Sequence, residues 1–238
     1  MSEERSSGDD QNPDSELDDL DIETTGVWEE PLGEGLDPHH DESLVVVPCG
    51  KPRGTPRVYI HTDALERIID HVRTQPKREV GGVLVGNFYT SKQQRVTEVR
   101  AAVDAPDAQG GVAHVTFSPE NWGVIHQRVE SELPGGSVVG WYHSHPGFGV
   151  FMSDQDLFIQ DNFFDGEGHV ALVIDPRKHD VGVFTWQLVG ERRAVRPAPG
   201  FWVFSPRRET AEKYPGMLEY RMANQKRPEG LLSRLLRR

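Results

Sequence analysis

The sequence has little cysteine and no long hydrophobic run. Its 238 residues include a single cysteine, Cys49, which excludes an internal disulfide framework and a cysteine-rich zinc module. No window approaches the roughly 18 consecutive apolar residues of a transmembrane helix, so we expect no membrane span. The opening MSEERSSGDD lacks a cationic start followed by an apolar stretch, so we also expect no signal peptide. These absences together predict a cytoplasmic protein.

The net charge of −12 is distributed unevenly along the chain. Residues 1–45 hold sixteen acidic residues and one basic residue, whereas residues 192–238 hold twelve basic and four acidic ones. Residues 1–45 also lack a sustained hydrophobic period, so we expect a disordered acidic tail, either an interaction arm or a solubilising leader. Residues 206–238 form a basic C-terminal extension, with helices expected over 209–224 and 229–238. Either extension could contact partner proteins, but no nucleic-acid module accompanies the basic residues, so no nucleic-acid partner is expected.

Residues 56–205 alternate short apolar strands with a few helices. One helix is expected to begin at Thr62 or Asp63, because apolar residues then recur at the spacing of one helix face: Leu65, Ile68, Ile69 and Val72. Further helices are expected at 118–133 and 153–164. Strands are expected at 57–60, 80–89, 95–103, 112–117, 138–143, 169–175 and 181–187. This pattern predicts the α/β (α+β) class, a single domain with a mixed central β-sheet flanked by helices.

Two histidines and an aspartate have the spacing of a metal site. His143 and His145 stand two residues apart at the end of an expected strand, so both imidazoles point to the same face. Ser153 then opens a helix that carries Asp156 in its first turn. Two imidazoles and a carboxylate without a nearby thiolate make zinc the default ion, and three protein ligands leave a fourth position open, as catalytic sites do. Neither the histidine pair nor the pair of Ser153 and Asp156 is specific for a metal site by itself, since Ser153 and Asp156 also form an ordinary N-cap pair.

A metal hydrolase also needs a base that moves a proton from water to the leaving group. Glu79 is a candidate, because it is an acid at the head of the otherwise apolar strand VGGVLVG. From the residues alone, Glu79 could equally be a solvated strand end or a partner of Lys77 or Arg78. The other histidines, His39 and His40 in the expected tail among them, lack ligand spacing, and Cys49 lacks a catalytic context.

A family resemblance connects these motifs. Glu79 with VGGVLVG, then GWYHSHPGFG, Ser153 and Asp156 resemble the JAMM (MPN-plus) zinc metalloproteases, which include deubiquitinating and isopeptidase enzymes. The resemblance covers residues 60–190 and implies an MPN-type domain. It also implies that His143, His145 and Asp156 bind one zinc ion per chain, that Glu79 is the general acid/base, and that the Ser153 hydroxyl binds the oxyanion of the intermediate.

The resemblance implies a zinc metalloprotease or isopeptidase. The expected reaction is hydrolysis of a peptide or isopeptide bond after the C-terminal tail of a ubiquitin-like protein, in deconjugation or precursor processing. The alternative is a non-catalytic MPN scaffold that recognises a ubiquitin-like partner. Like compact prokaryotic members of the JAMM family, the chain has no obvious long insertions and no second set of Cys and His residues.

The link between the histidines and the Ser153 helix is unusually apolar. Phe148, Val150 and Phe151 lie within residues 147–152. Beside a metal, these side chains would form the wall of a narrow cleft. Isopeptidases of the family that the sequence resembles take an extended tail ending in Gly-Gly, and only glycine lets such a backbone pass close to a crowded metal. The resemblance therefore implies a ubiquitin-like protein or its conjugates as the partner.

Overall fold

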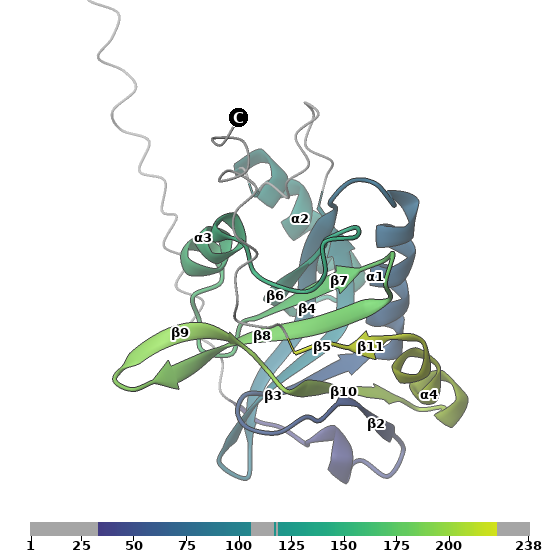
Figure 1. The fold of residues 1–238 in the computed structure, drawn as a ribbon. Helices are drawn as coiled ribbons and strands as arrows, with labels where there is room; N and C mark the ends of the chain where they lie inside the picture. Colours follow the sequence, from purple (N-terminus) through teal and green to yellow (C-terminus); the bar gives the residue numbers. More distant parts are fainter. Residues whose placement is uncertain (1–32, 106–116, 118, 223–238) are drawn as a thin grey trace, which may run out of the picture.

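The computed structural model describes residues 33–105, 117 and 119–222 (Figure 1). The strand expected at 112–117 and the helix expected at 229–238 lie outside the described residues, apart from Phe117. Most of the expected acidic tail, residues 1–32, and the last part of the basic extension, from residue 223 onward, also lie outside them.

The described residues form a mixed sheet with strand order β11-β8-β7-β6-β4-β5-β3-β10-β2, while β1 pairs with β4 and β9 pairs with β8. The strands are β1 (Gly33–Glu34), β2 (Val45–Gly50), β3 (Arg57–His61), β4 (Gly81–Ser91), β5 (Gln94–Asp104), β6 (Ser137–Ser144), β7 (Val170–Asp175), β8 (Asp180–Val189), β9 (Arg192–Pro197), β10 (Gly200–Ser205) and β11 (Glu219–Tyr220). The helices are η2 (Pro38–His40), α1 (Thr62–Thr74), α2 (Pro119–Glu132), α3 (Asp154–Phe163) and α4 (Arg208–Met217).

Helices cover both faces of this sheet. Leu65 and Ile68 of α1 and Tyr214 of α4 belong to one buried cluster, and α1 and α4 lie on the same side in Figure 1. Ile125 of α2 and Ile159 of α3 belong to a second cluster on the other face. The sheet contains both parallel pairs, such as β6–β7, and antiparallel pairs, such as β4–β6. The predicted α/β class with a mixed sheet flanked by helices is confirmed.

Helix α1 begins where the sequence predicts. Its first residue is Thr62, and the side chain of His61 caps it by accepting the backbone N–H of Asp63 at 3.2 Å. The apolar positions predicted for its inner face are all buried: Leu65, Ile68, Ile69 and Val72. Burial of this stripe against β3, β4 and β5 is therefore the main stabilisation of the helix.

The glycines of β4 and β6 allow adjacent strands to approach closely. A Cβ atom at Gly86 would overlap with the carbonyl oxygen of Glu98, and one at Gly140 would overlap with that of Val170. Gly140 also has a φ of +153°, which side chains rarely adopt. Gly86 thus packs on β5 opposite the start of β6, and Gly140 packs on β7 three residues before His143.

The folded part of the chain extends beyond the expected limits of 56–205. Strand β2 pairs along its whole length with β10, and residues 33–45 are not the disordered tail that the sequence predicts. Asp37 in that segment is fully buried and forms an ion pair of 2.6 Å with Arg57. These are non-local contacts, which composition does not reveal.

The helix expected over 209–224 is shorter in the structure. Helix α4 ends at Met217, because the next residues pair with β8. The backbone N–H of Glu219 donates to the carbonyl of His179 at 2.9 Å, and that of Arg221 donates to Val181 at 2.8 Å. None of the helices in the described part of the chain is both long and apolar enough to cross a membrane.

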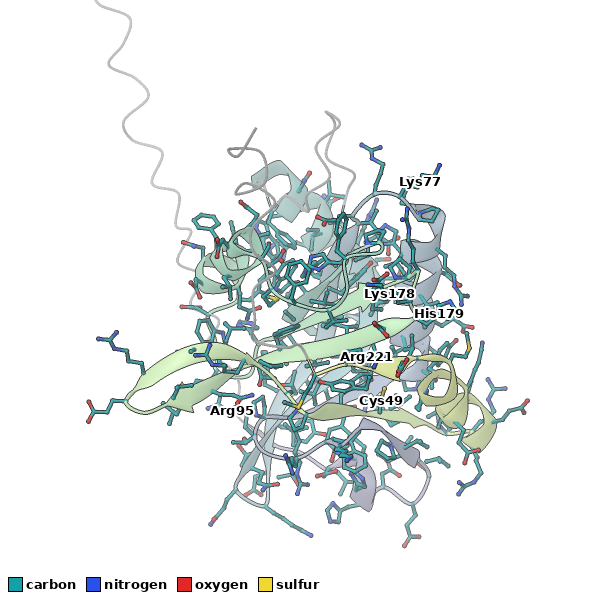
Figure 2. All side chains as sticks on the ribbon, in the orientation of Figure 1. Cys49, Lys77, Arg95, Lys178, His179 and Arg221 are labelled. Carbon is teal, nitrogen blue, oxygen red and sulfur yellow. The ribbon has the colours of Figure 1, made fainter. Side chains whose placement is uncertain are left out.

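The single cysteine lies in the interior of the molecule (Figure 2). Cys49 of β2 is 3% exposed, and burial raises the pKa of its thiol to about 12. A thiol with such a pKa is protonated at neutral pH and is a poor nucleophile.

Candidate metal centre

His143 and His145 lie at the end of β6, a strand with neighbours on both sides. Strand β6 lies between β4 and β7, so its end is held from both sides. The backbone N–H of His145 donates to Ile174 at 2.8 Å, and the hydroxyl of Ser144 accepts the N–H of Val80 at 3.1 Å. Because side chains alternate along a strand, the two imidazoles share the face opposite to Ser144.

Asp156 reaches the same place through the N-terminus of α3. Ser153 caps this helix by accepting the backbone N–H of Asp156 at 3.1 Å, while the Asp156 carboxylate accepts the N–H of Ser153 at 2.6 Å. This reciprocal capping box fixes the first turn of α3 and holds one carboxylate oxygen.

The three side chains form a buried cluster. Oδ1 of Asp156 lies 3.4 Å from Nε2 of His143, and Oδ2 lies 3.5 Å from Nε2 of His145. Each of the three residues offers one possible ligand atom, and these three atoms all lie within 4.8 Å of one another. Their exposed fractions are 2%, 3% and 7% for His143, His145 and Asp156. In the described ranges, no other His, Cys, Asp and Glu residues form such a group.

Aromatic rings fix the two imidazoles. The ring of His143 stacks on Trp141 with centroids 4.4 Å apart, and the ring of His145 lies 4.5 Å from Phe151. The indole nitrogen of Trp141 donates to the side chain of Gln160 on α3 at 2.8 Å. The strand and the helix that carry the cluster are thereby tied together beside it.

The electrostatics of the cluster match a cation site. Burial by itself would raise the pKa of Asp156, but the charge of His143 and contacts with His143, His145 and Ser153 hold it well below its usual range. Both ring nitrogens of His143 and Nδ1 of His145 are buried without a hydrogen-bond partner. A buried nitrogen without a partner costs about 1–3 kcal/mol, and a metal ion bound by Nε2 of His143, beside Asp156, would offset this cost for that atom. The residues therefore fit a zinc ion, which favours nitrogen and carboxylate ligands in tetrahedral geometry.

Glu79 lies next to the cluster along the backbone. Gly81 pairs with His143 across β4 and β6, and the carbonyl of Val80 accepts the N–H of Ser144 at 2.9 Å. The contact between Val80 and Ser144 extends this pairing by one residue, and Glu79 directly precedes Val80 in the chain. Glu79 is half-buried.

The loop between His145 and Ser153 is anchored by a residue that the sequence analysis did not identify. Oδ1 of Asp175 accepts the backbone N–H of Gly147 at 2.8 Å, and Oδ2 accepts that of Gly149 at 2.9 Å. Both glycines have positive φ, at 90° and 87°. Asp175 is fully buried, and backbone donors hold its pKa below the usual range although burial opposes this. The available signal was an acid at the end of the strand VALVID, directly before Pro176.

The turn after Asp175 also joins the loop to the segment of Glu79. Nε of Arg177 donates to the carbonyl of Pro76 at 3.2 Å, and a Cβ at Gly147 would lie 3.3 Å from the Arg177 side chain. Phe148 in the loop is 61% exposed, whereas Val150 and Phe151 are half-buried. Of the expected cleft wall, only Phe148 is exposed.

The fold and this cluster define a class of protein. Residues 54–165 match the family described as JAB1/Mov34/MPN/PAD-1 ubiquitin protease. This match supports the resemblance to the JAMM (MPN-plus) family that the sequence motifs predict.

Several characterised proteins are similar to the same part of the chain. The chain is 36% identical over 120 residues to the NAD(+) hydrolase TcpA of a Theionarchaea archaeon. It is 34% identical over 121 residues to the 26S proteasome non-ATPase regulatory subunit 14 of Drosophila melanogaster. It is 33% identical over 124 residues to the ubiquitin carboxyl-terminal hydrolase RPN11 of Saccharomyces cerevisiae. Each match covers 50% of this chain and 34%, 38% and 38%, respectively, of the relative. The chain thus spans well under half the length of these relatives.

Among solved structures, the chain is similar to the solution structure of a Desulfitobacterium hafniense protein. The TM-score is 0.43 and the identity 16%, over 58% of this chain and 89% of the other.

Proposed function

We propose that this protein is a zinc-dependent hydrolase that cleaves the peptide or isopeptide bond after the C-terminal tail of a ubiquitin-like protein. The observation that supports this most is the buried cluster of His143, His145 and Asp156, with imidazole nitrogens that lack partners. The cluster lies in a segment that matches a family of hydrolases, and one relative is named a ubiquitin carboxyl-terminal hydrolase.

In this proposal His143, His145 and Asp156 hold one zinc ion per chain. A bound zinc ion would supply a Lewis acid that stabilises negative charge developing on oxygen. The protein contributes the fixed geometry: β6 orients both imidazoles, and the capping box of α3 orients the carboxylate.

Glu79 is proposed to move the proton. Its carboxylate takes a proton from the attacking water and gives it to the nitrogen of the leaving amine as the carbon–nitrogen bond breaks. Water is consumed, a carboxylic acid and an amine are formed, and Glu79 returns to its starting state. The position of Glu79 supports this role, since it lies two residues before Gly81, which pairs with His143.

The first test concerns Glu79 and the metal. Purified protein should hold about one zinc ion per chain, and Glu79→Gln should keep it while kcat falls by about 10²–10⁴. Glu132→Gln, an exposed change in α2, is the matched control. Metal analysis and cleavage of a ubiquitin-like fusion measure both quantities. A chain that binds zinc but cleaves no ubiquitin-like fusion or conjugate would instead be a recognition scaffold.

The substrate class has a separate test. An extended tail that passes the loop of residues 147–152 must lie close to the half-buried side chains of Val150 and Phe151, so we expect only glycines to fit next to the scissile bond. Fusions that end in Gly-Gly should be cleaved, and a Gly→Leu change at either position should lower kcat/KM by steric exclusion. Equal kcat/KM values for all fusions would show that this substrate class is wrong.

A further inference from the structure

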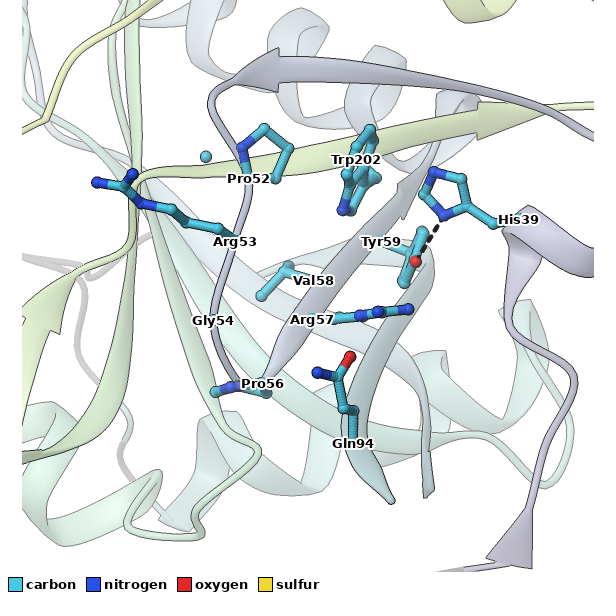
Figure 3. A pocket seen from close by; sticks show the side chains of 11 residues that line it. His39, Pro52, Arg53, Gly54, Pro56, Arg57, Val58, Tyr59, Gln94 and Trp202 are labelled. Carbon is cyan, nitrogen blue, oxygen red and sulfur yellow. Dashed lines mark hydrogen bonds between the residues drawn. The ribbon is translucent and has the colours of Figure 1, made fainter. Parts of the chain in front are cut away.

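A cavity of about 390 Å³ lies on the sheet at a distance from the proposed metal centre. It is formed by β3, β10, the loop of residues 52–56 and the segment around His39 (Figure 3). Strands β4 and β5 separate β3 from β6, which carries the histidines. At about 4.8 Å per strand, this places the cavity roughly 14 Å across the sheet from β6. The cavity shares no residue with the metal cluster.

One side of the cavity is apolar and rigid. Trp202 and Pro52 lie on this side in Figure 3, and Pro56 closes the end of the loop. The Trp202 ring is held edge-on against His39, with centroids 4.4 Å apart, and it lies beside the buried Tyr59 in the adjacent strand. Rings and prolines that are already fixed lose little conformational entropy on binding, so this wall suits a flat apolar ligand group.

The opposite side carries hydrogen-bond donors. Figure 3 shows Arg57 and Gln94 next to one another there. Nη1 of Arg57 donates to Oδ2 of the buried Asp37 at 2.6 Å, and Asp37 also accepts the backbone N–H of His39 at 2.9 Å. Burial opposes ionisation of Asp37, but these donors hold its pKa below the usual range. A guanidinium has five N–H donors in a fixed fork, so Arg57 is held in place with donors to spare.

The charged groups around the cavity favour a carboxylate over a phosphate dianion. No Asp or Glu is among the described residues that line the cavity, and its cations are Arg53 and Arg57. The buried carboxylate of Asp37 balances one of these charges. With histidine counted as neutral, one positive charge remains, which matches a carboxylate better than a phosphate dianion. A carboxylate also fits the guanidinium fork with two parallel hydrogen bonds.

We propose that this cavity binds a small planar carboxylate, with the carboxylate on Arg57 and Gln94 and the ring against Trp202 and Pro52. Arg53 at the rim has no hydrogen-bond or ion-pair partner within the described part of the chain, and it attracts the anion to the mouth of the cavity. The site is independent of the proposed hydrolase activity, because no side chain is shared.

Binding of benzoate to the full-length protein tests the proposal by calorimetry. Benzamide keeps the ring without the charge, acetate keeps the charge without the ring, and phenyl phosphate carries nearly two charges at neutral pH. Benzoate should bind at least about tenfold more tightly than each of the three. If benzoate does not bind, or if benzamide or acetate binds equally well, the proposal is wrong. Tighter binding of phenyl phosphate would overturn the assignment to a monoanion.

Variants then locate the site. Arg57→Lys removes the fork but keeps the charge, so benzoate affinity should fall about tenfold. Arg73→Lys on α1 is the matched control, because Arg73 is exposed and does not line the cavity. Gln94→Ala, at an exposed position, should also weaken benzoate binding. This variant tests the site if Arg57→Lys is too unstable to measure. Unchanged benzoate affinity in folded Arg57→Lys or in Gln94→Ala would show that benzoate binds elsewhere.

Discussion

The hydroxyl of Ser153 can cap α3 and still donate a hydrogen bond to an oxyanion. As the N-cap of α3 it accepts the backbone N–H of Asp156 at 3.1 Å, which uses an oxygen lone pair. A hydroxyl has two acceptor positions and one proton to donate, so the cap leaves that proton available for an oxyanion. The two roles have different energies, which makes them separable by experiment.

We predict that Ser153→Ala damages catalysis more than folding. Loss of the cap costs about 1 kcal/mol of unfolding free energy. Loss of an oxyanion donor costs about 3–4 kcal/mol in the barrier, or roughly 10²–10³ in kcat. Thermal melts and kcat on a Gly-Gly fusion measure the two effects, and Ser153→Thr, which keeps a hydroxyl, is the control. A variant that melts early but retains full kcat per folded molecule would assign Ser153 to the cap alone.

At the scale of elements, the loop of residues 147–152 depends on an anchor from another strand. Asp175 at the end of β7 accepts N–H groups from Gly147, Gly149 and Arg177. Both carboxylate oxygens are therefore occupied by backbone donors that lie between His145 and Ser153 or just after β7. This arrangement makes β7 part of the proposed zinc site although it supplies none of the proposed ligands.

Asp175→Asn should loosen that loop. An amide offers one acceptor oxygen and presents an NH₂ group to a backbone N–H, so at least one buried donor loses its partner, at a cost of about 1–3 kcal/mol. We predict faster hydrogen exchange at Gly147 and Gly149 and zinc affinity lower by about tenfold or more. Asp161→Asn, at an exposed site on α3, is the matched control. Wild-type exchange and zinc affinity in Asp175→Asn would contradict the anchoring role.

Local patterns and non-local contacts differ in what the sequence could reveal. The helix from Thr62 and the hairpin of β7 and β8 follow from periodicity and turn residues, and both are confirmed. The positions of His143, His145 and Asp156 follow from spacing, because a strand end and a helix start are local. Their roles in binding zinc stay predictions.

The features that the sequence analysis missed depend on distant partners. Residues 33–45 looked disordered because their composition is acidic, yet Asp37 is buried by Arg57, twenty residues away. Strand β11 continues the sheet only because β8 offers an open edge to Glu219 and Tyr220. Asp175 is 28 residues from Gly147. Such pairings cannot be obtained from composition or from a period of two or 3.6 residues.

At the scale of the whole molecule, His169 connects several elements. It is 3% exposed, and its Nδ1 accepts the backbone N–H of Gly166 at 2.9 Å. Its ring contacts Phe88 of β4 and Phe164 after α3, with centroids 5.3 Å and 5.9 Å away. Burial lowers the pKa of His169 to about 4, against smaller opposing effects of a backbone contact with Val138 and of the charge of Asp165.

This pKa predicts loss of stability on acidification. An unfolded histidine has a pKa of about 6.5, so between pH 6.5 and pH 4 the unfolded chain binds more protons than the folded chain. The contribution of His169 to the free energy of unfolding is therefore fully present above pH 6.5 and is lost as the pH falls toward 4. A shift of this size corresponds to roughly 3 kcal/mol.

Urea unfolding between pH 7 and pH 4 measures this contribution by difference. His169→Gln should be less stable than the wild type at pH 7, because a buried ring is lost, but its stability should fall less steeply with acid. Other groups that titrate in the same range are present in both chains and cancel in the difference. His126→Gln on α2, at an exposed position, should keep the wild-type slope. If His169→Gln and the wild type lose stability in parallel, the acid sensitivity belongs to other groups, and His169 is not held neutral by its burial.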